Sequence, residues 1–211
     1  MNVDVGKLSS PECGRASRLL ARAFAEDPII THFLYDRLRR RIAFPAFFRS
    51  VLEEMLPIGQ VYAAHSDGNL IGVAAWMPPN APEADAGARR AAARQRGVVR
   101  ILFPRAAQGL FDGFAALERF HPSDPHWYLA FVGIEPTIQS RGIGRALLAP
   151  VLKIADQTNT LCYLETPFPR THEFYARLGF VRHAEHHSFI GAPQGAVTFQ
   201  REPASGMQEW S

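Results

Sequence analysis

Apolar side chains recur along the chain in two periods, and these periods predict a mixture of helices and strands. Spacings of three and four residues are typical of helices that bury one face, whereas alternation or a short apolar run is typical of strands. The chain is predicted to begin with a strand, two helices and a β-hairpin. The predicted strands cover residues 3–7, 61–65, 70–77, 127–134, 161–166, 180–188 and 196–201, and the predicted helices cover residues 13–26, 37–54, 88–105, 110–120, 143–155 and 171–178.

Caps and prolines set the boundaries of several elements. Ser9 and Glu12 have the spacing of a capping box. Asp27 is expected to end the first helix, because a residue that precedes proline avoids the α region. Gly179 is placed to end the last helix in a left-handed conformation. An interior proline costs a helix about 3 kcal/mol, but the apolar stripe continues past Pro150 and predicts a kink rather than an end.

Length and composition indicate one α/β domain of medium size. We expect it to cover residues 1–203 and to be followed by a mobile tail over residues 204–211. The net charge of +3 is small, so it suits an anionic cofactor without requiring nucleic acid. Cys13 and Cys162 are far apart with apolar neighbours, which favours reduced thiols in the cytoplasm. No metal-type spacing, signal peptide or membrane-length apolar run is present, so neither a metal nor a membrane is expected.

Residues 88–105 are the one segment that could indicate nucleic acid, since arginines alternate there with alanine and apolar residues. We favour a solvated helix face, because a nucleic-acid surface usually adds aromatic stacking or a known motif. Steep salt dependence of binding would mark the alternative. Together with residues 110–120, this segment forms a helical insertion around residues 80–124, which we expect to wall one side of a site.

The most informative stretch joins the strand at residues 127–134 to the helix at residues 143–155. A helix that starts at a glycine-containing turn directs unpaired backbone N–H groups outward, and its dipole adds about half a positive charge. Glycines also let a phosphate approach the backbone closely. A plain strand-to-helix turn without a ligand is the alternative. The residues of the turn are Gln139, Ser140, Arg141, Gly142, Ile143 and Gly144.

Two common phosphate-binding templates do not fit this turn. A dinucleotide fingerprint requires a glycine where Leu147 stands, and a P-loop requires Gly-Lys followed by Ser or Thr. The remaining pattern is glutamine, two residues, glycine, one residue and glycine. It resembles the acyl-CoA pyrophosphate loop of the GNAT superfamily of N-acyltransferases.

A second stretch, residues 174–180 with the sequence Phe-Tyr-Ala-Arg-Leu-Gly-Phe, follows about thirty residues later, in the order that this superfamily has. Alone, it would indicate a core aromatic pair and a glycine cap. The element order is similar to the GNAT fold over almost the whole chain, which implies a mixed, mostly antiparallel twisted sheet flanked by helices. Closer resemblance to puromycin N-acetyltransferase and its relatives rests on His126, Trp127, Tyr128, Leu129 and Ala130, on Leu164, Glu165 and Thr166, and on Pro169 and Arg170.

The resemblance implies that acetyl-CoA is the cosubstrate and that an amine attacks its thioester directly, without a metal. Backbone groups after the middle of the central strand would bind the pantetheine arm, and Gly133 would allow close approach or a β-bulge. Many relatives have asparagine where Thr171 stands, so this contact departs from the pattern. The implied cofactor-binding residues are Val132, Gly133, Ile134, Gln139, Ser140, Arg141, Gly142, Ile143, Gly144, Arg145 and Thr171.

Tyr175 is the candidate general acid for the departing thiolate, because a phenol with a pKa of about 10 is protonated when a thiol of about 8.5 ionises. A tyrosine that only packs is the alternative. Glu165 is the best candidate base, directly or through water, although a carboxylate that caps the next loop is equally consistent. His32, His126 and Asp27 are lesser candidates for the base. The residues implied on the acceptor side are Phe24, Asp27, His32 and Tyr128.

These observations predict an enzyme that acetylates a primary amine of a small molecule, as a monomer or homodimer. Neither nucleic acid nor membrane is an expected partner. A noncatalytic acyl-CoA sensor is the alternative: the absence of an evident base favours it, and the retained tyrosine opposes it. The amine and the acyl length cannot be derived from the chain, because variable helices and loops form acceptor pockets.

Overall fold

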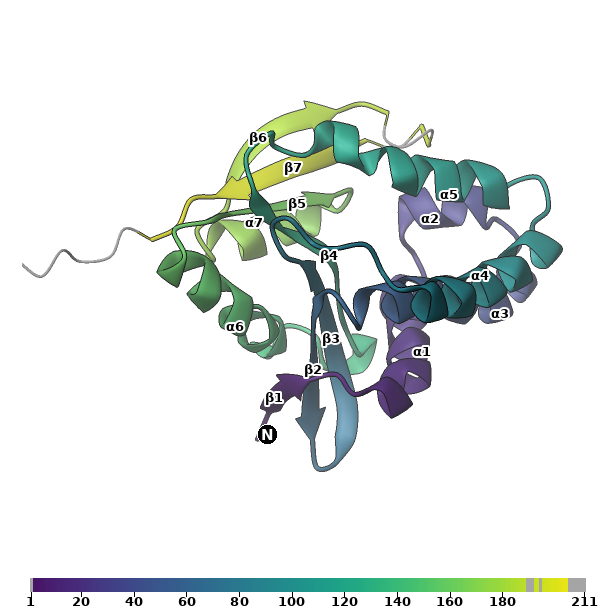
Figure 1. Cartoon of the computed structure of the whole chain (residues 1–211), viewed down its shortest axis with the longest axis horizontal. Coiled ribbons are helices and arrows are strands. Elements are labelled where there is room, and N and C mark those ends of the chain that lie inside the picture. The colour runs from purple at the N-terminus through teal and green to yellow at the C-terminus, as the bar shows by residue number, and fades with distance from the viewer. Residues whose placement is uncertain (1, 189–191, 194, 205–211) are drawn as a thin grey trace, which may run out of the picture.

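One seven-stranded sheet, with helices on both faces, makes up the architecture (Figure 1). The computed structural model describes residues 2–188, 192–193 and 195–204. The strands lie in the order β1-β2-β3-β4-β5-β7-β6, and each neighbouring pair is antiparallel except β4 and β5. The predicted mixed, mostly antiparallel sheet is therefore confirmed. The tail predicted to be mobile lies almost entirely outside the described residues.

The elements agree with the predicted order, and most boundaries differ by one to three residues. The strands are β1 (Asp4–Lys7), β2 (Gln60–Ser66), β3 (Asn69–Met77), β4 (His126–Ile134), β5 (Leu161–Thr166), β6 (Val181–His186) and β7 (Ala196–Arg201). The α-helices are α1 (Cys13–Ala23), α2 (Pro28–Phe33), α3 (Arg37–Met55), α4 (Ala86–Leu102), α5 (Ala107–Ala115), α6 (Ile143–Gln157) and α7 (Pro169–Ala176). Three short 3-10 helices are η1 (Ser10–Glu12), η2 (Ala116–Phe120) and η3 (Pro136–Ile138).

Side-chain caps explain where the first helices begin and end. The capping box between Ser9 and Glu12 is present as predicted. The helix predicted to reach residue 26 ends earlier, at Ala23, because Asp27 caps a separate helix. Its carboxylate accepts hydrogen bonds from the backbone N–H groups of Ile29 and Ile30 at 3.0 and 2.8 Å. Asp27 therefore starts α2 as well as ending the segment before it.

Other predicted turns and breaks are confirmed. Gly179 has a φ of 88°, the left-handed conformation expected after α7. Helix α6 continues through Pro150, and α3 likewise contains Pro45. The predicted insertion holds α4, α5 and η2 between β3 and β4. In the part of the chain that the structure describes, no helix has the length and apolar content needed to cross a membrane.

The core is divided by the sheet into two main clusters. Helices α1, α3, α4 and α5 bury side chains against one face, where Phe131 contacts the rings of Phe24, Phe47 and Phe48. Helices α6 and α7 cover the other face. In Figure 1 these two helices lie on the left of the central strands and the first group on the right. Strand β4 lies in the middle of the sheet, between the two clusters, and β5 is its neighbour.

Candidate functional site

The central strands β4 and β5 separate after a short paired segment. Only residues 126–128 of β4 pair with β5, opposite residues 161–163, although both strands continue further. On its other edge β4 remains paired with β3 as far as Ile134. Residues 129–134 therefore present one edge whose backbone groups have no strand partner among the described residues. Such an edge binds extended ligands through main-chain hydrogen bonds.

A β-bulge lies in β4 where the strands separate. Trp76 pairs with Leu129 and Ala75 pairs with Phe131, so Ala130 is the extra residue. Of the two alternatives given for Gly133, the bulge is not found there, since that residue pairs regularly with Val73. Gly133 is required for a different close approach: a Cβ there would lie 2.8 Å from Cδ2 of Leu20 on α1.

The turn before α6 has the backbone of an anion site. Ser140 and Gly142 both have left-handed φ angles, 63° and 82°, and no side chain caps the helix. The N–H groups of the first turn of α6 are thus available to a ligand. A Cβ on Gly142 would meet no atom within 4 Å, so this glycine serves the backbone conformation. Arg141 and Arg145 are exposed beside it.

Gly144 has a packing role that differs from the predicted one. Its Cβ would lie 3.0 Å from Cζ of Phe174 and 3.2 Å from Cδ1 of Ile134. Gly144 is buried, and its missing side chain makes room for the aromatic ring of α7. The two sequence motifs are therefore in direct contact.

Two predicted cofactor-binding side chains hold the loops together instead. The amide Nε2 of Gln139 donates to the carbonyl oxygen of Ile134 at 3.2 Å, bracing the end of β4. The hydroxyl of Thr171 donates to the carbonyl oxygen of Phe168 at 2.8 Å and lies 2.9 Å from the hydroxyl of Thr166. Both residues therefore brace the loops around the site.

Tyr175 lies on the face covered by α6 and α7, next to Phe180 and Phe199. It is 6% exposed, and burial raises the pKa of its hydroxyl above the usual value near 10. The hydroxyl therefore keeps its proton at neutral pH, as a general acid requires.

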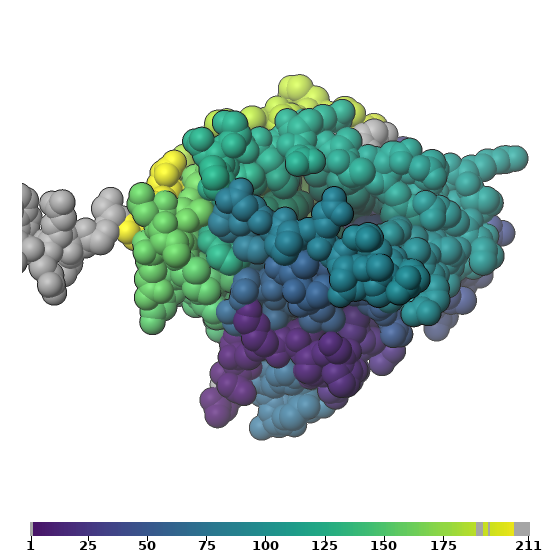
Figure 2. Space-filling model, viewed as in Figure 1, coloured from purple at the N-terminus to yellow at the C-terminus, as the bar shows by residue number. Residues whose placement is uncertain are grey.

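A pocket of about 910 Å³ opens on the opposite face of the sheet, between α3, α4, α5, η2 and the start of β4. Tyr128, Ala130 and Phe131 of β4 line it, so it reaches the bulge. In Figure 2 the surface is hollowed between the blue segment that follows β3 and the teal segment of α5 and η2. A reagent on the free edge of β4 would thus meet a second reagent that enters through this pocket.

The charges on the pocket wall are mainly negative. Four carboxylates line it, compared with two guanidinium groups. One of the two, on Arg96, is paired with Glu54 at 2.8 Å, and the other, on Arg100, lies over the ring of Phe111 at 5.3 Å. A wall of this kind favours a cationic ligand. The four carboxylates belong to Glu54, Asp112, Glu118 and Asp124.

A row of polar side chains runs from this pocket into the sheet. The carbonyl oxygen of Asp124 lies 2.8 Å from Nδ1 of His126, and Nε2 of that ring lies 3.2 Å from Nδ1 of His121. Nε2 of His121 in turn lies 3.5 Å from Oε1 of Glu165. Both atoms of this last pair are shielded from solvent and have no hydrogen-bond partner among the described residues.

Two tyrosines enclose the row. The rings of Tyr128 and Tyr163 pack on His121, with centroids 4.3 and 4.9 Å away. Burial first, and then the charge of Glu165, raise the pKa of both hydroxyls above the usual value. Sequence patterns indicated Glu165, Tyr128 and His126 but not His121, which follows η2 outside any periodic segment. Only its proximity in space distinguishes His121 from other histidines.

Three residues predicted on the acceptor side do not line this pocket. Phe24 packs against Phe131 behind β4, and Asp27 is buried as the cap of α2. His32 is exposed and contacts Phe33. Of the four residues predicted there, the structure brings only Tyr128 to the pocket.

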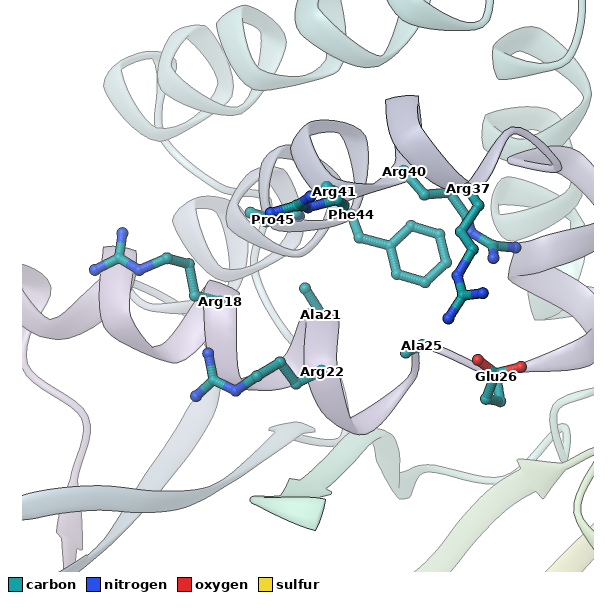
Figure 3. Close-up of a pocket in the computed structure, with 10 residues that line it drawn as sticks. All are labelled: Arg18, Ala21, Arg22, Ala25, Glu26, Arg37, Arg40, Arg41, Phe44 and Pro45. Carbon is teal, nitrogen blue, oxygen red and sulfur yellow. The ribbon is translucent and has the colours of Figure 1, made fainter. Parts of the chain in front are cut away.

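A second, smaller pocket of about 350 Å³ lies between α1 and α3 (Figure 3). It is strongly basic, with Glu26 as the only acid on its wall. Arg22 is the member with an ion-pair partner among the described residues, Glu135 at 2.6 Å. The arginines that line this pocket are Arg18, Arg22, Arg37, Arg40 and Arg41.

Comparisons with known proteins agree with this geometry. Residues 31–180 match the model of the acetyltransferase (GNAT) family. An uncharacterized N-acetyltransferase of Schizosaccharomyces pombe is 23% identical over 188 residues, which are 83% of this chain and 73% of that protein.

Solved structures share the fold. A Corynebacterium glutamicum protein described as histone acetyltransferase HPA2 and related acetyltransferase has a TM-score of 0.74 at 24% identity, over 98% of this chain and 99% of that chain. A GNAT family acetyltransferase from Elizabethkingia anophelis with acetyl-CoA bound has a TM-score of 0.50 at 13% identity, over 95% of this chain and 98% of that chain. At such identities the likeness concerns the fold alone.

Proposed function

The chain belongs to the acetyltransferase (GNAT) family, and from that premise we propose that it transfers an acetyl group from acetyl-CoA to a primary amine of a small molecule. The observation that carries this proposal is the overlap of two features at Ala130. This residue lies on the free edge of β4, which starts after Tyr128, and it also lines the pocket proposed for the acceptor. We propose that residues 1–203 act as one domain in the cytoplasm, without nucleic acid or membrane, as a monomer or homodimer.

The cofactor is proposed to lie along the free edge of β4 and the start of α6. Backbone groups of Val132 and Gly133 would bind the pantetheine arm in the manner of an added strand. The free N–H groups at residues 142–145 would hold the pyrophosphate, because helix N-termini favour anions. Arg141 and Arg145 would add charge. When bound, acetyl-CoA supplies the activated acetyl group, and one backbone N–H at the bulge would polarise its carbonyl, a contribution of about 3 to 4 kcal/mol.

The acceptor is proposed to enter through the pocket on the opposite face. Its surplus of carboxylates supports a cationic amine. Tyr128 stands beside Ala130 on the wall and would contact the acceptor. The resemblance of residues 126–130 and 164–166 to puromycin N-acetyltransferase and its relatives supports an antibiotic-like or metabolite amine.

Two residues carry the proposed proton transfers. Tyr175 would donate its hydroxyl proton to the departing sulfur, and its raised pKa keeps that proton available. Glu165 would supply the negative charge of the base. Its side chain is 5% exposed and lies behind His121, so it would act through intervening groups rather than by contact with the amine.

Thermal denaturation with and without acetyl-CoA tests the cofactor site first. Saturation at about one hundred times the dissociation constant should stabilise the protein by about 2.7 kcal/mol. Free-thiol release is then followed over a panel of polyamines, aminoglycosides, aminonucleosides and amino-terminal peptides. An absence of stabilisation would refute the proposal at its first step. Stabilisation without turnover would favour the acyl-CoA sensor, which the polar row beside the pocket makes the weaker alternative.

A further inference from the structure

The donors and acceptors in the row from Asp124 to Glu165 determine where its protons lie. A carbonyl oxygen only accepts, so Nδ1 of His126 carries the hydrogen directed at Asp124. In the neutral ring, Nε2 of His126 is then an acceptor. This tautomer follows from the partners of the ring, since hydrogen positions are inferred from such a network.

His121 cannot satisfy both of its neighbours while it is neutral. If its hydrogen is on Nε2, facing Glu165, then the lone pairs of His121 Nδ1 and His126 Nε2 face each other at 3.2 Å. If its hydrogen is on Nδ1, the lone pair of Nε2 faces the carboxylate at 3.5 Å. In either tautomer the row lacks one proton. The tautomer of His121 with its hydrogen on Nε2 is favoured, because an ionised carboxylate is a stronger acceptor than the ring nitrogen of His126.

The vacant proton position lies on the pocket side of the row. His121 and His126 both line the pocket, whereas Glu165 does not. Burial is the main cause that lowers the pKa of His126 below its usual value, so its ring is neutral near pH 7. The rings of Tyr128 and Tyr163 pack on His121, the charge of Glu165 raises the pKa of His126, and the charge of His121 lowers it. The lining of the same pocket also includes two carboxylates and two guanidinium groups near this end, those of Glu118, Asp124, Arg96 and Arg100.

We propose that His121 and His126 together form the base that deprotonates the acceptor amine, and that Glu165 holds His121 in the Nε2–H form. This inference rests on the proposed function. The N–H bond of the ammonium breaks, and its proton enters the 3.2 Å gap between the two rings. The electron pair freed on nitrogen forms the C–N bond as the thioester C–S bond breaks. Tyr175 gives its hydroxyl proton to the departing sulfur, and the second proton that leaves the nitrogen restores that hydroxyl.

The tautomers are measured in the full chain without any ligand. Long-range ¹H–¹⁵N correlation of ¹⁵N-histidine-labelled protein distinguishes the two nitrogens of each ring, and the spectra of His121→Gln and His126→Gln identify the signals. We expect Nδ1–H for His126 and Nε2–H for His121 above the pH at which the pair releases its proton. Glu165→Gln should weaken the preference of His121. The opposite tautomer in either ring would overturn the proposal.

Single-turnover kinetics measure the role in catalysis, with the panel amine on which the wild type is most active. His121→Gln retains an N–H that reaches Glu165 but has no basic nitrogen. At pH 7 this variant and His126→Gln should slow acetyl transfer about 100-fold. The defect should shrink as the pH approaches the amine's own pKa of about 10, because a free amine needs no base. His183→Gln, an exposed histidine on β6, is the matched control and should keep the wild-type rate.

The outcomes separate this inference from the proposed function. Equal stabilisation by acetyl-CoA in all variants would show that they fold and bind. A defect of the same size at every pH, or full activity of His121→Gln, would assign His121 a structural role and overturn the proposal. No turnover by the wild type on any amine would overturn the proposed function, and the base with it. Wild-type turnover with unaffected variants would overturn the base alone.

Discussion

A Cβ added at Gly144 would lie 3.0 Å from Cζ of Phe174, so the turn that begins α6 and the helix that carries Tyr175 pack too closely for a side chain at residue 144 unless the ring moves. The glycine pattern and the Phe-Tyr pattern belong to one structural unit. A substitution at either residue is therefore expected to displace the other.

Gly144→Ala should lower the free energy of unfolding by about 1 to 3 kcal/mol through overpacking. The higher helix propensity of alanine offsets part of this loss. Gly144→Ala should also weaken acetyl-CoA binding, because Phe174 must move. Gly97→Ala in α4 is the matched control: its new Cβ meets nothing within 4 Å, so stability should rise by up to about 1 kcal/mol. Urea denaturation measures both. Equal responses of the two variants would contradict the packing argument.

Asp27 should make the protein less stable as the pH rises from about 4 to about 6. Burial raises the pKa of its carboxyl to about 6, despite hydrogen bonds from Ile30 and Ile29. The folded state therefore holds a proton that the unfolded chain has already released, and the contribution is about 2 to 3 kcal/mol. Asp27→Asn keeps the capping oxygen and should flatten this part of the pH profile, with stability at pH 7.5 at least that of the wild type.

Asp85 provides the control for that experiment. It caps α4 in the same way, through the backbone N–H groups of Gly87 and Ala88, but it is exposed. Those hydrogen bonds lower the pKa of its carboxyl. The contribution of Asp85 to the free energy of unfolding should be lost as the pH falls. Asp85→Asn should therefore change the pH dependence of stability at acidic pH only. The same change in both variants would mean that burial does not govern Asp27.

Arg201 should stabilise the end of β7 at neutral pH but not in strong acid. Its guanidinium forms two hydrogen bonds to Asp156, at 2.7 and 2.9 Å, and a third to the carbonyl oxygen of Leu178. The first of these lowers the pKa of Asp156, so the stabilisation is present above pH 4 and is lost below it. Arg201→Lys cannot form this fork and should cost about 1 to 3 kcal/mol at pH 7. The loss should vanish near pH 2; a loss independent of pH would mean that packing dominates.

Tyr175→Phe should slow the chemical step of acetyl transfer about 100-fold without weakening acetyl-CoA binding. Because burial raises the pKa of Tyr175, the wild-type rate should show no decline from ionisation of this hydroxyl below pH 10. Rapid-quench measurement of a single turnover isolates the step. An unchanged rate in Tyr175→Phe would leave the tyrosine with packing alone, in contact with Phe174, Phe180 and Phe199.

The sequence predicted the element order, the glycine turn and Tyr175 because each has a local signature: a period, a cap or a fixed spacing. It did not reveal the bulge at Ala130, since an inserted residue is defined only by its partners on β3. His121 was missed for the same reason, because its neighbour Glu165 comes from a different strand. Gly133 and Gly144 show that close packing of a helix against a strand or another helix can itself require glycine, whether or not a ligand also binds there.

Because Ala130 is an extra residue in β4, the side chains that face the acceptor pocket can be changed separately from the backbone edge proposed for the cofactor. Before Ala130, even-numbered side chains such as Tyr128 face the acceptor pocket and odd ones such as Leu129 face α6; after it, Phe131 faces the acceptor side and Val132 the α6 side. A mutant library at positions 128 and 130 would therefore alter amine selectivity while leaving the cofactor edge intact. Deleting Ala130 would remove the bulge and leave plain alternation from Leu129 to Phe131, so the later residues of β4 would keep their faces while the strand lost its extra residue beside the pocket.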